Sequence, residues 1–426
     1  MNLRATPRRG GVRRLLASIF PLKIKTLAHS LFDTSKPRRV AAARRLSPLK
    51  RRLGLNRRPE GVNLVAYIRA EMGLGEAARG LATALEGTGI PFNVINLEHG
   101  NPGRHADLSW AHREAPASGY DVTVVSVNPD NTVNLLEHTP TGVLGDSYVV
   151  GNWYWELPEF PEEWMHAFAY VNEVWAPTRF IQEAVALKSP VPVVRVPPVV
   201  NPAPPHAAPR SHFGLPDRRF LFLTMFDVNS VPARKNPVGV LRAFTEAFPR
   251  PDEGVGLVLK VSSSDRRHPF LRTLAEEVAG RDDLFVIDRL MGRGELNSLI
   301  SLCDCFVSLH RSEGFGLGPA EAMYFGKPVI VTDWSGNTDY MTKDNSIGID
   351  YRLVRVGQDY GPYKAHQLWA EPDVGQAAHW MKRVSRDRAL AERIGGRGRE
   401  TITSAHSPEA VGETIRKRLE YIRRGL

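Results

Sequence analysis

The chain has 426 residues and a formal net charge of +10, from 56 Lys and Arg against 46 Asp and Glu. This length is enough for two domains with separate hydrophobic cores. No apolar run approaches the ~18 residues of a membrane span, so we expect a protein without one. Residues 1–60 hold 17 of the basic residues and two acids, whereas the remainder has 39 basic and 44 acidic residues. A basic arm therefore precedes a mildly acidic body.

The arm allows two interpretations. Residues 12–32 alternate apolar and basic groups with a break near Pro21, and one or two short amphipathic helices of this kind could lie on an anionic membrane surface. A disordered, solvated leader has the same composition, and both interpretations stay open. Nucleic-acid binding is disfavoured because the arm has no pattern of interleaved aromatic residues. We expect the body, from about Gly61, to fold without residues 1–58.

Cysteine content indicates the compartment. Cys303 and Cys305 occupy alternate positions around a predicted strand start, and no other cysteine is present. This spacing favours core packing over a disulfide or a metal site. Residues 13–20 are too short for the apolar region of a signal peptide, and no clean cleavage site follows. We therefore expect a reduced, cytoplasmic protein.

The body begins with a predicted buried strand at residues 61–68, followed by a glycine turn and a helix. Gly73, Gly75 and Ala78 fit the G-x-G-x-x-A pattern of dinucleotide-binding loops, and Glu98 follows the next predicted strand. Such a pattern on its own is weak support for an NAD-dependent enzyme.

Strands and helices alternate through the rest of the body, which predicts parallel, doubly wound sheets. The proline-rich segment 201–216 is a predicted linker between two domains. Further strands are predicted at 92–97, 121–129, 147–157, 191–200, 220–228, 256–263, 283–288, 304–309, 329–332 and 347–351, and helices near 269–280, 294–302, 375–395 and 407–424.

The stretch from residue 308 to 340 is the most informative. After a short strand, Gly314, Gly316 and Gly318 give a loop whose backbone N–H groups can approach a ligand closely. Pro319 marks the next helix start, and Glu321 is predicted in its first turn. A second turn, DWSGN, follows the next strand. In open parallel sheets ligands bind at such loops, at the carboxyl ends of the strands.

Glu313 and Glu321 lie eight residues apart, one in the glycine loop and one in the helix. Both carboxylates can accept hydrogen bonds from the hydroxyls of a sugar or ribose seated over the helix N-terminus. That terminus supplies N–H groups and positive potential for a phosphate between them. A Glu in the first turn of a helix is on its own typical of simple helix stabilisation. The prediction of a sugar-phosphate site therefore rests on Glu313, Glu321 and the helix N-terminus together.

The sequence SEGFGLGPAEAMYFGKPVIVTDWSGNTDYM resembles the motif of family 4 retaining glycosyltransferases, which have the GT-B fold and a Glu-x7-Glu pair. The resemblance covers about residues 61–405 and is stronger after residue 217. It implies two Rossmann-like, doubly wound α/β domains facing across a cleft. An acceptor domain at 61–205 would be followed by a donor domain at 206–405, and a C-terminal helix at 406–426 would pack back on the first.

The resemblance also implies residue roles. Glu313 would hold the donor hexose, and Glu321 the ribose. RKNP resembles the family's diphosphate site, with Lys235 matching its lysine, while Ser230 stands where many members have an arginine and Arg234 would compensate. We expect catalytic roles for Glu313, Lys235 and Arg234. Further donor contacts would come from the glycine loop and the second turn, through Phe315, Gly316, Leu317, Gly318 and Asn337.

The first domain departs from the family at one position. Many members have a His at the end of the strand at 147–157, where this chain has Trp153, Trp155 and Glu156. Sugar contact by Trp155 and Glu156 and packing at a domain interface are both open. In GT-B enzymes the loop corresponding to Gly73 and Gly75 approaches the donor phosphate or the acceptor.

The sequence therefore predicts a retaining hexosyltransferase that uses a nucleotide-sugar donor and a glycan, lipid-linked or other hydroxyl acceptor. No Asp-x-Asp motif stands at a strand end, so we expect no metal or other cofactor. An NAD-dependent oxidoreductase and a non-catalytic sugar-binding protein of the same fold are the alternatives. As a loop residue, Glu313 is expected to contribute only about 0.5 kcal/mol to stability.

Overall fold

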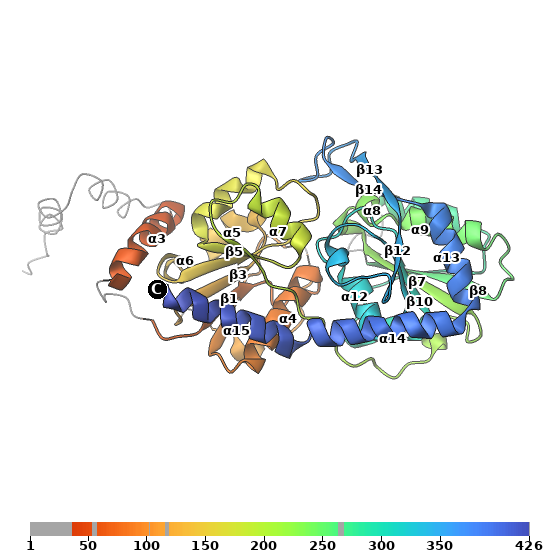
Figure 1. Cartoon of the computed structure of the whole chain (residues 1–426), viewed down its shortest axis with the longest axis horizontal. Coiled ribbons are helices and arrows are strands. Elements are labelled where there is room, and N and C mark those ends of the chain that lie inside the picture. Colours follow the sequence, from red (N-terminus) through yellow and green to blue (C-terminus); the bar gives the residue numbers. More distant parts are fainter. Residues whose placement is uncertain (1–35, 53–57, 102, 116–118, 263–267, 426) are drawn as a thin grey trace, which may run out of the picture.

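The computed structural model describes residues 36–52, 58–101, 103–115, 119–262 and 268–425. Two six-stranded sheets form the cores of two domains that lie side by side (Figure 1). Every strand pair within these two sheets is parallel. The strand orders are β2-β1-β3-β4-β5-β6 and β12-β11-β10-β7-β8-β9. These sheets confirm the predicted pair of doubly wound α/β domains.

In the first domain the central strands β1 and β3 are buried at every residue, which is typical of apolar runs in parallel sheets covered on both faces. Helix α4 begins in the glycine turn and covers one face. The strands are β1 (Val62–Ala66), β2 (Phe92–Asn96), β3 (Val122–Ser126), β4 (Tyr148–Asn152), β5 (Glu173–Ala176) and β6 (Val193–Arg195), and the helices are α4 (Gly73–Gly87), α5 (Thr132–His138), α6 (Thr141–Gly145), η3 (Glu162–Tyr170) and α7 (Arg179–Ala186).

The second domain repeats this plan. Its strands are β7 (Phe220–Asp227), β8 (Val255–Ser262), β9 (Leu284–Asp288), β10 (Cys305–Ser308), β11 (Val329–Thr332) and β12 (Ile347–Ile349), and its helices are α8 (Pro232–Lys235), α9 (Pro237–Ala247), α10 (Pro269–Val278), α11 (Arg293–Leu302), α12 (Leu317–Tyr324), α13 (Val374–Arg386) and α14 (Arg388–Ala405). Cys303 and Cys305 are buried free thiols in its core.

Two features of this domain differ from the prediction. The helix expected at 375–395 is two helices, because the Asp387 side chain accepts a hydrogen bond from the Leu390 N–H and starts α14 there. An antiparallel hairpin of β13 (Tyr351–Arg355) and β14 (Leu368–Pro372) interrupts the alternation of strand and helix. It lies at the edge of the domain that faces the first domain (Figure 1).

The C-terminal helix α15 (Pro408–Arg424) lies along the first domain beside α4 (Figure 1). Its buried face contributes Val411, Ile415 and Leu419 to the first domain's core. Two ion pairs hold it there, Arg418 with Glu173 at 2.5 Å and Arg423 with Asp121 at 3.0 Å.

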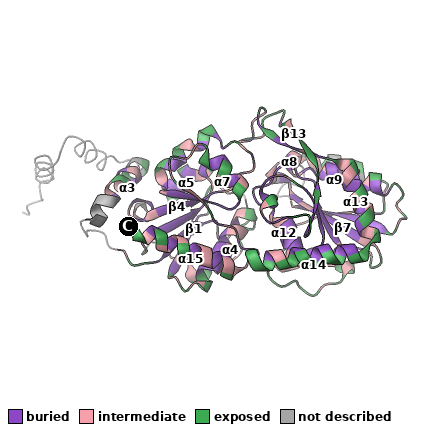
Figure 2. Ribbon diagram, viewed as in Figure 1, coloured by how far each residue is buried: buried purple, intermediate pink, exposed green. Residues whose placement is uncertain are grey.

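Part of the basic arm also belongs to this domain. Helix α3 (Lys36–Arg52) packs on α6, with Val40 and Ala42 buried. Figure 2 shows the buried strands of both domains in purple. Arg44 donates a 3.0 Å hydrogen bond to Asn172. The amphipathic segment predicted at 12–32 lies outside the described residues. No helix in the described part of the chain combines the length and apolar character needed to cross a bilayer.

Candidate active site

Three of the predicted site residues meet at the carboxyl ends of β7 and β10. Arg234 and Lys235 end the short helix α8 after β7, and Glu313 lies in the loop after β10. Glu313 Oε2 lies 3.3 Å from Arg234 Nη1, and Oε1 accepts a hydrogen bond from Lys235 Nζ. Glu313 is 9% exposed and Arg234 is 4% exposed. The sequence places these groups 78 and 79 residues apart, and the fold joins them in one ion cluster.

The two cations of the cluster keep Glu313 ionised. Burial alone would raise the pKa of Glu313, but the neighbouring Lys235 and Arg234 cations outweigh it and lower that pKa to about 2. Glu313 is therefore a carboxylate at neutral pH. Arg234 also donates to the Ser312 carbonyl at 2.8 Å and to the Ser230 carbonyl at 3.4 Å.

Unusual backbone conformations shape the loops around the cluster. Val231 and Asn236, on either side of α8, have φ values of 57° and 52°, and a positive φ strains a β-branched residue such as Val. Asn236 caps α9 by accepting from the Gly239 N–H. Opposite them, Ser335 has φ 76°, and its hydroxyl accepts a 2.8 Å hydrogen bond from the Glu313 N–H. The loops after β7 and β11 therefore both contact the loop that carries Glu313.

Glu321 lies in helix α12 and contacts a different cation from those that pair with Glu313. Helix α12 starts at Leu317, because Gly316 takes a left-handed conformation (φ 85°) and acts as its N-cap. The prediction that Glu321 lies in the first turn is therefore wrong, and it lies in the second. Its carboxylate is 3% exposed and accepts a hydrogen bond from Arg293, the first residue of α11.

The other predicted donor contacts support the loops. Phe315 is 5% exposed and packs on Tyr340 and His406, with ring centroids at 4.9 and 5.3 Å. Asn337 is buried, and its amide links His310 to the Thr332 carbonyl. Leu317 packs against the second domain's core, and a Cβ at Gly318 would lie 3.1 Å from Phe306. The side chains of Phe315 and Asn337 thus face the core.

Trp155 lies in the domain interface. It is 1% exposed, stacks on Tyr363 at 5.3 Å between centroids, and donates from Nε1 to the Glu159 carbonyl. Of the two interpretations for Trp155, the structure shows interface packing. Glu156 accepts a hydrogen bond from the Tyr363 hydroxyl at 2.9 Å and, through its carbonyl, one from Ser312.

The two glycines of the dinucleotide-type pattern lie in the first turn of α4. Gly75 has a packing reason, since a Cβ there would lie 2.0 Å from the Ala70 carbonyl oxygen, whereas the space around Gly73 is open. Glu98, the acid of that pattern, is paired with Arg69 at 3.6 Å on the surface.

Three residues that the sequence did not single out take part in the site. His310 lies two residues after the end of β10, is completely buried, and has its pKa lowered by that burial. The sequence could have indicated His310, because a polar residue directly after a predicted strand is a candidate for a site at the end of a parallel sheet. Arg293 stood only as an ordinary residue before a predicted helix. Tyr363 gave no signal, because the hairpin that carries it was not predicted.

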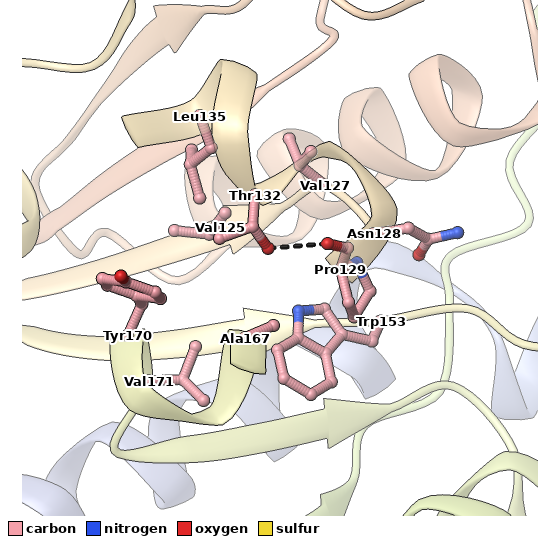
Figure 3. Close-up of a pocket in the computed structure, with 10 residues that line it drawn as sticks. All are labelled: Val125, Val127, Asn128, Pro129, Thr132, Leu135, Trp153, Ala167, Tyr170 and Val171. Atoms are coloured by element: carbon pink, nitrogen blue, oxygen red, sulfur yellow. Dashed lines mark hydrogen bonds between the residues drawn. The ribbon is translucent and has the colours of Figure 1, made fainter. Parts of the chain in front are cut away.

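A small, mostly apolar cavity lies in the first domain, between α5 and η3 (Figure 3). Thr132 Oγ, which lines it, donates to the Pro129 carbonyl at 2.6 Å. None of the ion-cluster side chains lines this cavity. No group of three or more His, Cys, Asp or Glu side chains that could hold a metal ion occurs among the described residues.

The comparisons with known proteins concern the same region. Residues 222–400 match the family model described as glycosyl transferases group 1. This segment contains Arg234, Lys235, Glu313, Glu321 and the hairpin. No curated protein matches the chain significantly in sequence.

Solved structures show the fold. A sucrose-phosphate synthase from Thermosynechococcus elongatus has a TM-score of 0.61 at 15% identity, covering 86% of this chain and 100% of that one. HepE from Anabaena, solved with UDP and glucose, has a TM-score of 0.58 at 13% identity, covering 85% and 100%. A mutant of TarM from S. aureus, solved with UDP, Fondaparinux and alpha-GlcNAc-glycerol, has a TM-score of 0.52 at 13% identity, covering 72% of this chain and 56% of TarM. The fold is GT-B. Together, this fold and the family match over residues 222–400 support a glycosyltransferase.

Proposed function

We propose that the protein is a retaining glycosyltransferase of the Glu-x7-Glu type, which transfers a hexose from a nucleoside diphosphate sugar to an acceptor hydroxyl. The observation that carries the proposal is the buried cluster of Glu313, Lys235 and Arg234 at the carboxyl ends of β7 and β10. It lies inside the segment that matches the family, and HepE, which shares the fold, was solved with UDP and glucose.

Each member of the cluster has a task in the reaction. The bond between the sugar's anomeric carbon and the diphosphate breaks while the acceptor oxygen bonds to the same face of that carbon. Lys235 and Arg234 stabilise the negative charge that grows on the leaving diphosphate, which takes up the acceptor's proton. Glu313, an anion at neutral pH, accepts hydrogen bonds from the donor's hydroxyls. Because two cations serve the leaving group, we propose catalysis without a metal or other cofactor.

The acceptor and the location follow from the first domain and the arm. We assign the acceptor, a glycan or lipid-linked hydroxyl, to the carboxyl ends of the first sheet, where Glu156 accepts a hydrogen bond from Tyr363 of the second domain. TarM, a neighbour of the same fold, was solved with a glycan ligand. The basic residues at 1–60 suit attachment to the anionic inner face of a membrane, so the protein would be cytoplasmic and peripheral.

The test begins with a panel of UDP-, GDP- and ADP-sugars. A ligand at 100 times its Kd adds ~2.7 kcal/mol to the stability of the folded state, which a thermal scan detects. The sugar that stabilises the protein is then supplied with glycan and polyprenyl-phosphate-linked acceptors, and the anomeric configuration of the product is read by NMR. Inversion would refute retention. Binding without turnover on any acceptor would favour a sugar-binding protein, and bound NAD would favour an oxidoreductase.

A further inference from the structure

Arg293 begins α11 in the second domain and lies between two carboxylates. Its Nη2 donates to Glu321 Oε1, and its Nε lies 3.5 Å from Glu76 Oε1. Glu76 belongs to α4 of the first domain and directly follows Gly75. The three side chains therefore form an ion triad, Glu321–Arg293–Glu76, that joins the two domains at the start of α4.

We propose that Arg293 is the positioning residue of the donor's ribose site: it holds the Glu321 carboxylate in place and, through Glu76, brings the start of α4 against the same site. This inference rests on the proposed function, in which Glu321 accepts the hydroxyls of the donor's ribose. Arg293 itself acts through Glu321 and is not assigned to the reacting atoms.

The geometry leaves Glu321 able to bind a hydroxyl. Arg293 contacts only Oε1, and within the described residues Oε2 makes no hydrogen bond. Glu321 is 3% exposed, and burial penalises an unpaired charge. Arg293 therefore supplies the cation that favours the ionised form of this carboxylate and leaves its second oxygen for a ligand.

The charges around Glu321 make opposite contributions. Burial raises the pKa of Glu321, the Arg293 cation lowers it, and the Glu76 carboxylate raises it. Glu76 is itself shared with Arg79 at 2.7 Å, and Arg79 also pairs with Asp107 at 3.3 Å. Removing Arg293 and removing Glu76 should consequently move the pKa of Glu321 in opposite directions.

The experiment measures nucleotide affinity against pH. UDP, GDP and ADP are titrated by calorimetry between pH 5 and 8.5, and the one that binds the wild-type protein is used throughout. A ribose hydroxyl donates to the ionised carboxylate, so affinity should fall on the acid side as Glu321 takes up a proton. Arg293→Gln should move the midpoint of this fall to higher pH and weaken binding at pH 7 by about tenfold or more, the effect of losing a charge-assisted hydrogen bond.

The other variants sharpen the result. Glu76→Gln should move the midpoint to lower pH, and Arg293→Lys should restore part of the affinity. Glu321→Gln should remove the part of the acid-side fall that Glu321 causes, alone and combined with Arg293→Gln. The part that remains comes from the nucleotide's own terminal phosphate, which takes up a proton at pH ~6. Arg388→Gln is the charge-matched control, because Arg388 lies on the exposed face of α14 and pairs only with Glu392 among the described residues. It should change neither affinity nor midpoint.

The outcomes separate the two proposals. If Glu321→Gln weakens the nucleotide but Arg293→Gln leaves affinity and midpoint unchanged, the inference is wrong and the proposed function stands. A shift of the same sign in Glu76→Gln and Arg293→Gln would also overturn it. If the wild-type protein binds none of the three nucleotides, the proposed donor site fails and the inference fails with it. Should Arg293→Gln not fold, the Glu76→Gln and Arg293→Lys series decides the matter.

Discussion

The hydroxyl of Tyr363 donates a 2.9 Å hydrogen bond to Glu156 across the boundary between the two domains. Tyr363 lies between β13 and β14 of the second domain, and Glu156 follows β4 of the first. The same tyrosine ring stacks on Trp155, and the Arg234 guanidinium lies 5.8 Å from its centroid. The hairpin therefore connects the packing between the domains to a cation of the ion cluster.

Tyr363→Phe should separate these roles. The ring packing stays, and the lost hydrogen bond should lower the free energy of unfolding by about 1 kcal/mol. Transfer should fall more than donor affinity, because Glu156 and the acceptor side lose a partner while Glu313 and Lys235 keep theirs. Urea unfolding, calorimetry with the donor and initial rates measure the three quantities. Equal losses in donor affinity and rate would contradict this division.

Part of the candidate site was predictable from the sequence, whereas the hairpin of β13 and β14 was not. The buried strands around Glu313 were predictable because apolar runs end in glycine turns, and the pair of glutamates has a fixed spacing. Strand β13 is exposed along most of its length, so it has neither a buried run nor the alternation that indicates a half-buried strand. The Glu321–Arg293–Glu76 triad depends on how α4, α11 and α12 dock, and local sequence carries no information on that.

Glu313→Gln should abolish transfer and also destabilise the protein. The expectation of a nearly neutral change assumed a solvated loop residue, but Glu313 is 9% exposed and pairs with two cations. Breaking a buried ion pair from one side typically costs ~3–5 kcal/mol, because the remaining charge is uncompensated. Chemical denaturation gives the change. Glu98→Gln, at an exposed surface pair, is the matched control and should stay within about 0.5 kcal/mol.

Acid should reduce stability through the same residue. The folded-state pKa of Glu313 is about 2 against an ordinary value of 4.5, so its contribution is fully present above pH 4.5 and is lost as pH falls towards 2. The difference corresponds to about 3 kcal/mol. The stability gap between wild type and Glu313→Gln should therefore narrow between pH 5 and 2.5. A gap that stays constant over this range would show that Glu313 is not held by its cations.

Glu321→Ala and Glu313→Gln should affect different ligands. Glu321 is assigned to the ribose, which is present both in the free nucleoside diphosphate and in the sugar donor, so Glu321→Ala should weaken both. Glu313 is assigned to the hexose, so Glu313→Gln should weaken mainly the sugar donor. Calorimetry with the two ligands on each variant measures the four affinities. If each variant lost the same affinity for both ligands, the assignment of Glu321 to the ribose and Glu313 to the hexose would be wrong.

Within the basic arm, we expect helix α3 to contribute to the stability of the fold and residues 1–35 not to. Helix α3 packs Val40 and Ala42 into the first domain, so the expectation that residues 1–58 are dispensable for folding needs revision. Deleting residues 1–35 should leave stability unchanged. Deleting residues 1–58 should lower it by ~2 kcal/mol or more, since even one fully buried Val contributes ~1.5–3 kcal/mol. Thermal unfolding of both truncations tests this, and equal stability would show that α3 contributes nothing to the fold.

The same truncations test membrane attachment. Residues 1–35 hold seven Lys or Arg and residues 36–60 hold ten, and each cation near an anionic surface contributes ~1 kcal/mol. Sedimentation with phosphatidylglycerol–phosphatidylcholine vesicles should therefore decrease in two steps, from the full chain through the 1–35 deletion to the 1–58 deletion. Binding should disappear in 1 M salt, where screening acts within ~3 Å. Donor affinity of the 1–35 deletion should equal that of the full chain, because the ion cluster lies wholly in the second domain. If all three proteins sediment alike, the attachment surface lies in the body, and if none does, the arm is a solvated leader.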